Sequence, residues 1–190
     1  MRLRTFPSSP LSRRARPRVA SAALAFGFFL FALFGLALSR TYGDIAALWP
    51  ATAFVVMTAW RNPCIPVAPT LVGVAVSATL ASIATGTSVD LAAALAIVDV
   101  IEVGLGIAGL KWLGERRIDR SVSVFLAALT IVGAVAPAAG ATLGAAAVHW
   151  WLGLVFRAVW TTWWIGNVLG AAIVLPIGAS ATRRRLTAIV

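Results

Sequence analysis

The sequence predicts an all-α, polytopic transmembrane helix bundle of about six spans with both termini cytoplasmic. The first observation is composition: 61% of the 190 residues are hydrophobic and only 12% are charged, whereas soluble domains are about 45–50% apolar and 25% charged. The second is that long apolar runs follow one another without the polar alternation of barrel strands. The third is that the charged residues cluster between those runs, as orientation signals do in membrane proteins.

Six apolar stretches are candidate spans, because a membrane-crossing helix needs roughly 20 apolar residues. They cover residues 19–38, 45–60, 67–85, 91–113, 121–148 and 158–179. The second stretch is short and contains Trp49-Pro50. The fifth stretch is long and contains Pro137 and Gly140, so we expect a kink there. The connections are short and leave no room for an extramembrane domain.

The positive charges predict the orientation and the domain limits. Residues 1–18 hold six arginines and no acidic residue, which predicts a disordered basic cytoplasmic arm. Residues 19–180 form the predicted membrane domain, and residues 181–190 a basic cytoplasmic tail. With a cytoplasmic N-terminus, 14 of the 16 Lys and Arg residues fall inside and only Arg40 and Arg157 fall outside. This bias predicts that both termini are cytoplasmic.

Several function classes are excluded by the residues that the chain has. Because the basic residues lie between apolar runs, the net charge of +10 reflects membrane orientation, and we expect no nucleic-acid partner. A single cysteine, Cys64, and a single histidine, His149, exclude a thiolate cluster and a multi-histidine metal site. We expect no metal and no cofactor. No serine–histidine pair or phosphate-binding loop is present, so we predict that the protein is not an enzyme.

The clearest candidate site is a pair of acidic residues inside the fourth span. Asp99 and Glu102 are three residues apart, so both carboxyl groups lie on one helical face. A charged residue at the bilayer centre costs on the order of 2.5–3.5 kcal/mol, so we expect both to face the bundle interior. Asn167 lies at a similar depth in the sixth span, beside Trp163. This group is either a hydrogen-bonded contact between helices or a site for a ligand, an ion or a proton.

Tryptophans and small residues complete the pattern. Trp49-Pro50 is predicted to mark the outer end of the second span, because proline suits the first turn of a helix. The alternative role for Trp49 is a place in the ligand site. Most of the other tryptophans fit an aromatic belt at the two membrane surfaces. Gly140-x-x-x-Gly144 and Gly166-x-x-x-Gly170 predict close helix contacts.

These motifs, in this order, resemble the bacterial membrane-associated sensor domain, first class of the MASE type, over roughly residues 22–180. The matching segments are Ala47-Leu-Trp49-Pro50-Ala-Thr-Ala53, Arg61-Asn-Pro63 with Pro66, Asp99-x-x-Glu102, and Trp160-Thr-Thr-Trp163-Trp164-Ile-Gly166-Asn167-x-x-Gly170 with Pro176. The resemblance implies a multi-pass input module of the bacterial plasma membrane. Members are commonly fused to diguanylate cyclases, phosphodiesterases or histidine kinases. Their ligand is largely undefined.

The chain departs from the family pattern at three positions. It has Ala53 where the family usually has glycine, Asp99 where it usually has asparagine, and Asn167 where it usually has aspartate. The last two resemble an exchange of one carboxylate between contacting helices, which predicts that Asp99, Glu102 and Asn167 form one buried network. Members also tend to have about eight spans and a cytoplasmic output domain.

Three functions stay open at this stage. The leading one is a sensory input module that binds an unknown small ligand and acts on a cytoplasmic signalling domain or protein. The second is a small transporter or proton-coupled permease that uses the two intramembrane carboxylates, and the third is a structural membrane subunit. The expected surroundings are the lipid bilayer, and a second copy of the chain is a further candidate partner. The candidate site residues are Asp99, Glu102, Asn167, Trp163, Trp49 and Pro50.

Overall fold

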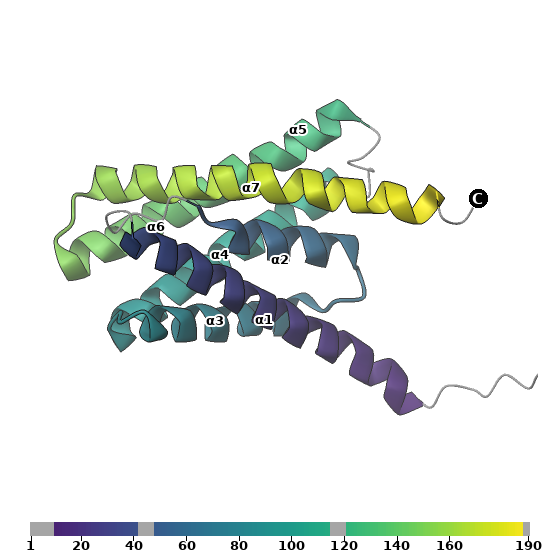
Figure 1. Ribbon diagram of the computed structural model, residues 1–190, viewed down its shortest axis with the longest axis horizontal. Coiled ribbons are helices and arrows are strands. Elements are labelled where there is room, and N and C mark those ends of the chain that lie inside the picture. The colour runs from purple at the N-terminus through teal and green to yellow at the C-terminus, as the bar shows by residue number, and fades with distance from the viewer. Residues whose placement is uncertain (1–9, 42–47, 115–120, 188–190) are drawn as a thin grey trace, which may run out of the picture.

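The computed structural model describes residues 10–41, 48–114 and 121–187, with side chains described for 18–38, 48–114 and 121–180. Within these residues the chain is helical and has no strand, which confirms the predicted all-α bundle (Figure 1). The elements are α1 (Pro10–Thr41), α2 (Pro50–Arg61), α3 (Val67–Ala84), α4 (Val89–Leu113), α5 (Val122–Thr130), the π-helix η1 (Ile131–Val135), α6 (Ala136–Leu152) and α7 (Phe156–Thr187). Residues 1–9 of the predicted arm lie outside the described part. α1 starts within that arm, at Pro10.

Five helical segments in the described part are long and apolar enough to cross a membrane. They are Arg18–Leu38, Val67–Ala84, Val89–Leu113, Val122–Leu152 and Phe156–Ser180. α5, η1 and α6 together make the fourth of these segments. The chain is therefore a multi-pass membrane protein. The predicted second span is the exception, because α2 has only 12 residues and is about 18 Å long against a hydrocarbon core of about 30 Å.

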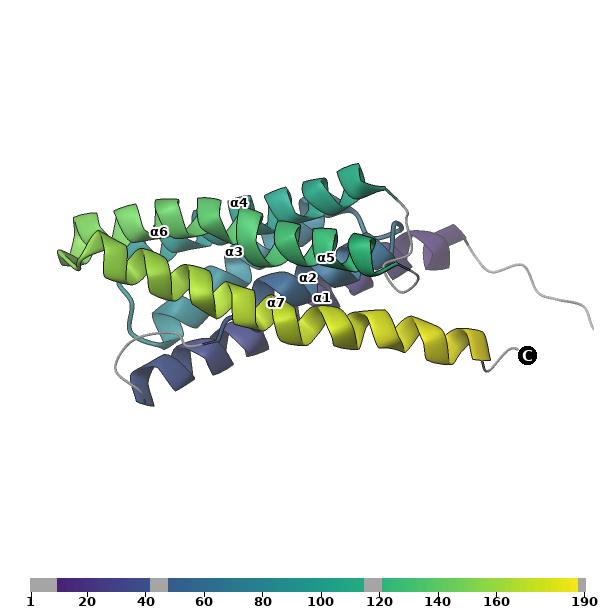
Figure 2. The same cartoon turned by 90° about the horizontal axis from the view of Figure 1, so that it is seen from above.

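α2 begins inside the bundle. In Figure 1, α1 ends at the left of the bundle, whereas α2 begins near its middle and runs back to the right. α2 packs against α7, α4 and α1. The start of α1 and the end of α7 lie at the same end of the bundle in both views (Figures 1 and 2).

Small and hydroxyl-bearing residues join α1 to α3. A side chain at Gly73 would meet the Cβ of Ala25 at 2.7 Å, so the two helices approach closely. The Ser77 hydroxyl donates to the Ala25 carbonyl at 2.8 Å, and the hydroxyls of Ser21 and Thr70 are 3.3 Å apart. Without a hydrophobic driving force between helices in lipid, such close packing and polar contacts hold a bundle together.

Glycines in the left-handed region end two of the spans. Gly114 (φ 85°) follows α4 and Gly153 (φ 69°) follows α6. The Gly153 amide donates to the His149 carbonyl at 2.9 Å, so it closes the last turn of α6 and lets the chain reverse into α7. A residue with a Cβ would be strained in this conformation.

The fifth span contains a π-helix upstream of its proline, whereas the predicted kink stays a prediction. The π-helix covers Ile131–Val135 and ends two residues before Pro137. Proline has no amide hydrogen and its ring crowds the preceding turn, so the hydrogen-bond pattern changes N-terminal to it. Such π-helical turns are frequently found at functional sites.

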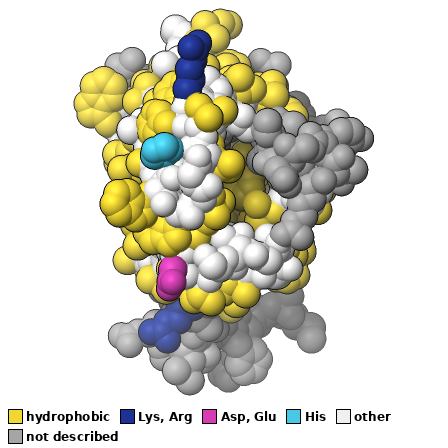
Figure 3. All heavy atoms as spheres, turned by 90° about the vertical axis from the view of Figure 1, so that its left-hand side faces the viewer, with side chains coloured by type: hydrophobic (Ala, Val, Ile, Leu, Met, Phe, Trp, Pro, Cys, Tyr) yellow, Lys and Arg dark blue, Asp and Glu magenta, His cyan; other side chains and the backbone are white. Residues whose placement is uncertain are grey.

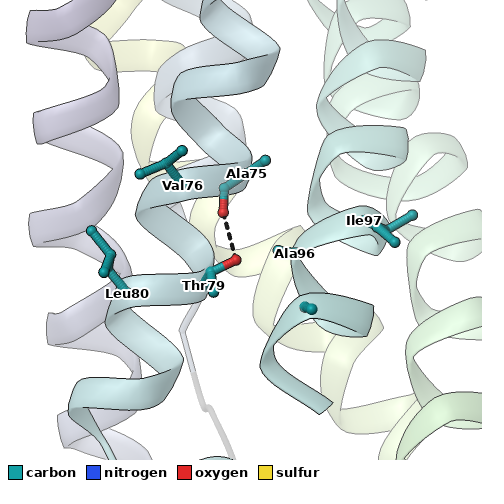
Figure 4. Close-up of a pocket in the computed structure, with 7 residues that line it drawn as sticks. Ala75, Val76, Thr79, Leu80, Ala96 and Ile97 are labelled. Carbon is teal, nitrogen blue, oxygen red and sulfur yellow. Dashed lines mark hydrogen bonds between the residues drawn. The ribbon is translucent and has the colours of Figure 1, made fainter. Parts of the chain in front are cut away.

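The outer surface of the bundle is apolar. Trp112 and Trp150 are 85% and 83% exposed, in agreement with contact with lipid at the predicted membrane surfaces. Figure 3 views the end that carries the α3–α4 and α6–α7 connections, where the described atoms include few charged side chains. A groove of about 360 Å³ lies between α3 and α4 (Figure 4). None of its lining residues is charged, and its one hydroxyl, on Thr79, donates to the Ala75 carbonyl at 2.8 Å.

Candidate functional site

Asp99 and Glu102 lie on the buried face of α4, near the middle of the helix. Asp99 is 4% exposed and Glu102 is fully buried. They face the bundle interior, as their position in a membrane span requires. The two carboxyl groups also lie close enough to interact electrostatically.

The Trp163 indole connects this pair to α7. Its Nε1–H donates to Glu102 Oε2 at 3.2 Å. α2 and α6 each pack against both α4 and α7, so the long indole reaches across the bundle to the carboxyl. This bond joins two helices that are 61 residues apart in the sequence.

Two glycines of α6 make room for this contact. A Cβ at Gly140 would lie 3.0 Å from the Glu102 carboxyl carbon, and a Cβ at Gly144 would lie 2.7 Å from the Trp163 ring. The Gly140-x-x-x-Gly144 motif therefore allows the close approach that its spacing predicts. In addition, it forms the wall against which the carboxyl and the indole pack.

Trp49-Pro50 starts α2 at mid-depth, which corrects the prediction that the pair marks the outer end of the span. The Trp49 amide donates to the Gly166 carbonyl at 2.9 Å. A Cβ at Gly170 would lie 2.6 Å from the Trp49 carbonyl carbon. Both glycines lie near the midpoint of the span Phe156–Ser180. Trp49 thus lies inside the bundle, where its backbone bonds α7 because glycine there removes the side chain.

The first turn of α2 brings Thr52 to the acidic pair. Pro50 occupies the first turn, as expected from its fixed φ and missing N–H. Thr52 is 2% exposed, and its hydroxyl lies beside the Glu102 carboxyl. The positive end of the α2 dipole therefore opens toward a carboxyl group, an arrangement that favours negative charge.

Asn167 is buried but uses its amide within its own helix. It is 3% exposed, and its Nδ2 donates to the Trp163 carbonyl at 3.2 Å. It supports the residue that bonds Glu102. The direct Asp99–Asn167 contact stays a prediction.

Trp164 attaches α7 to the π-helix η1, and Trp160 attaches α7 to α6. Trp164 Nε1 donates to the Ala134 carbonyl of η1 at 3.0 Å, and Trp160 Nε1 donates to the Thr142 hydroxyl at 3.1 Å. The two rings stack with centroids 5.8 Å apart. A backbone carbonyl of the π-helix thus accepts a hydrogen bond from a side chain of α7.

The role of Thr52 and the Trp164–Ala134 bond were not predicted from the sequence, and Gly140 was predicted only as a kink and packing residue. Two features of the sequence pointed to these residues. One is the second apolar stretch, which has only 16 residues and carries Trp49-Pro50 near its start. The other is the Gly140-x-x-x-Gly144 motif, which was interpreted as packing alone. A short apolar stretch in which the helix starts internally could have indicated a helix that begins inside the membrane, with the amides of its first turn directed at the site.

Comparison with known proteins gives one match. The family model MASE1, a membrane-associated sensor domain, matches residues 20–187. No curated protein and no solved structure matches the chain significantly.

Proposed function

Because the chain belongs to the MASE1 family of membrane-associated sensor domains, we propose that it is a sensory input module in which a buried intramembrane site controls the position of α7. The site consists of Thr52, Asp99, Glu102 and Trp163, with Trp49-Pro50 and Asn167 as supporting residues. The proposed location is a bacterial plasma membrane with both termini cytoplasmic, as the 14-to-2 partition of positive charge indicates.

The observation that carries the proposal is the Trp163–Glu102 hydrogen bond. It attaches the buried pair of α4 to α7, the helix that continues from this point to Thr187. In Figure 1, α7 extends beyond the other labelled helices at its C-terminal end. A change at the pair can therefore reach that end through one continuous helix.

Signalling requires that the ligand bind one packing of the bundle more tightly than another, because a ligand with equal affinity shifts no equilibrium. A ligand that engages Glu102 competes with the Trp163 indole for the carboxyl oxygens. We propose that binding releases or reorients Trp163 and so changes how α7 packs. We expect a cytoplasmic signalling domain or protein, such as a diguanylate cyclase or a histidine kinase, to respond to this change in packing.

A chimera tests the proposal. Residues 1–190 are joined through α7 to a diguanylate cyclase domain, and cyclic di-GMP is measured in cells. We expect Glu102→Gln and Trp163→Phe each to change the product level by about fivefold or more, the lower range of allosteric coupling. The matched controls are Asp90→Asn and Trp112→Phe, two exposed positions of α4. Unchanged product with normal membrane levels of both site variants would contradict the proposal.

The alternative function, a cation- or proton-coupled transporter, is favoured by one observation. Discontinuous helices that begin at the bilayer midplane form the substrate and ion sites of many transporters, and α2 begins at mid-depth beside the Glu102 carboxyl group. Transport would be measured as solute accumulation in proteoliposomes. Accumulation that Glu102→Gln abolishes, together with no effect in the chimera, would favour this alternative.

A further inference from the structure

Three oxygen atoms at the centre of the bundle have no hydrogen-bond partner of ordinary geometry among the described residues. They are Thr52 Oγ1, Asp99 Oδ1 and Glu102 Oε1, on residues that are 2%, 4% and 0% exposed. The Thr52 hydroxyl lies within hydrogen-bonding reach of the Glu102 carboxyl, and Asp99 interacts electrostatically with Glu102. Buried polar atoms nearly always have a partner. A Thr52–Glu102 contact still leaves Asp99 Oδ1 and further oxygen lone pairs open, which indicates that something binds between the two helices.

The charge balance of the site favours a cation. Among the described residues, the buried polar ones include no Lys, Arg or His. The described ionisable side chains on the helices around the site lie near the helix ends: Arg61 on α2, Asp90 and Lys111 on α4, His149 on α6 and Arg157 on α7. The α2 N-terminus supplies roughly half a positive charge, against up to two full negative charges from the carboxyl groups. Negative charge is therefore in excess when both carboxyl groups are ionised.

The packing around the pair favours a very small ligand. Gly140 packs against the Glu102 carboxyl, and Trp163 bonds its second oxygen. An organic molecule would need space that these contacts fill. In the described part of the chain, no group of three or more His, Cys, Asp or Glu residues could hold a metal ion, which disfavours the transition metals that need nitrogen or sulfur ligands.

We propose that Thr52, Asp99 and Glu102 bind a small monovalent cation, an alkali ion or ammonium, at the middle of the membrane. The three oxygens are hard ligands that suit such an ion. Na⁺ and H⁺ sites of other membrane proteins use backbone carbonyls and half-helix C-termini, whereas here the negative carboxyl groups must outweigh the positive N-terminus of α2. This inference rests on the proposed sensory function of the same site and names the chemical class of its ligand.

Thermal unfolding of the purified full chain in detergent tests the inference. NaCl, KCl and NH₄Cl are titrated at constant pH, with N-methyl-D-glucamine chloride keeping the ionic strength fixed. We expect at least one of the small cations to raise Tm saturably, by about 5 °C at a concentration well above its Kd. If Tm depends on ionic strength but not on the identity of the cation, the inference is wrong.

Variants assign the effect to the three residues. Asp99→Asn and Glu102→Gln are expected to abolish the cation-dependent rise in Tm, and Thr52→Val to raise the half-saturating concentration about tenfold. Asp90→Asn, on the exposed first turn of α4, is the control and should keep the full response. A full response in Asp99→Asn and Glu102→Gln would place the cation elsewhere and overturn the inference. The wild-type titration decides the question by itself if a variant does not fold.

The chimera separates this inference from the proposed function. If the cations leave Tm unchanged while Glu102→Gln still alters cyclic di-GMP, the cation inference fails and the sensory proposal stands. If the cations raise Tm through Asp99 and Glu102 while the chimera ignores Glu102→Gln, the cation site stands and the sensory proposal fails.

Discussion

Glu102 is bonded by Trp163, a contact that depth alone did not predict. Its burial could be predicted, because a carboxyl group in the middle of a span must face the bundle interior. Asn167 was predicted to join Asp99 and Glu102 in one network because its depth matches that of Asp99. Its amide bonds the Trp163 carbonyl within α7, and its direct contact with Asp99 stays a prediction. Trp163, whose indole is long enough to reach across α6, bonds Glu102. Depth could be predicted from the sequence, whereas the reach and rotamer of a side chain could not.

A double-mutant cycle between Trp163→Phe and Glu102→Gln measures this bond in terms of free energy of unfolding. We expect a coupling of about 1.5–3 kcal/mol, the range for hydrogen bonds that involve a charged group. The comparison cycle combines Asp99→Asn with Asn167→Asp. We expect its coupling to be smaller but not zero, because Asn167 supports Trp163. A larger coupling in the Asp99–Asn167 cycle would show that the direct contact dominates.

The half-span α2 is the element that defines the site. It runs beside α7, with Trp49-Pro50 against Gly170 and Met57 against Gly178. Eight residues separate the contacts on each helix, or about 12 Å, so the two helices are parallel and in register. The sequence indicated that this stretch was short and that a helix starts at Pro50. It did not indicate the depth, because the Gly166 carbonyl that fixes it lies more than a hundred residues away in the chain.

Gly170→Ala tests the contact between α2 and α7. A Cβ there would overlap the Trp49 backbone, which cannot move as a flexible side chain can, so we expect a loss of about 1–3 kcal/mol. This loss corresponds to a fall in Tm of roughly 3–10 °C, measured by thermal unfolding in detergent.

The matched control is Gly104→Ala on α4. A Cβ at Gly104 has no atom within 4 Å, so this change should leave Tm unchanged or raise it slightly, because alanine is the better helix former. Equal effects of the two substitutions would contradict the close approach of α2 to α7.

At the scale of the whole molecule, the buried site lies between the part of the bundle around α4 and the helix α7. Apolar runs and charge clusters were sufficient to predict a multi-pass helical bundle, because the bilayer fixes the length and polarity of its spans. They could not predict which helices are neighbours. That depends on small residues such as Gly73, Gly140 and Gly170, whose packing partners lie far away in the sequence.

The central claim is that the Trp163–Glu102 bond fixes the position of α7 relative to α4. The direct measurement is the distance between spin labels at Lys111→Cys and Ser180→Cys, near the C-terminal ends of the two spans and both exposed, in a Cys64→Ser background. We expect Trp163→Phe to move the distance distribution by about 2 Å or to add a second population, the size of helix shifts in switching proteins. Trp150→Phe, on the exposed surface, should leave the distribution unchanged. If Trp163→Phe also leaves the distribution unchanged, the bond does not position α7 and the claim is wrong.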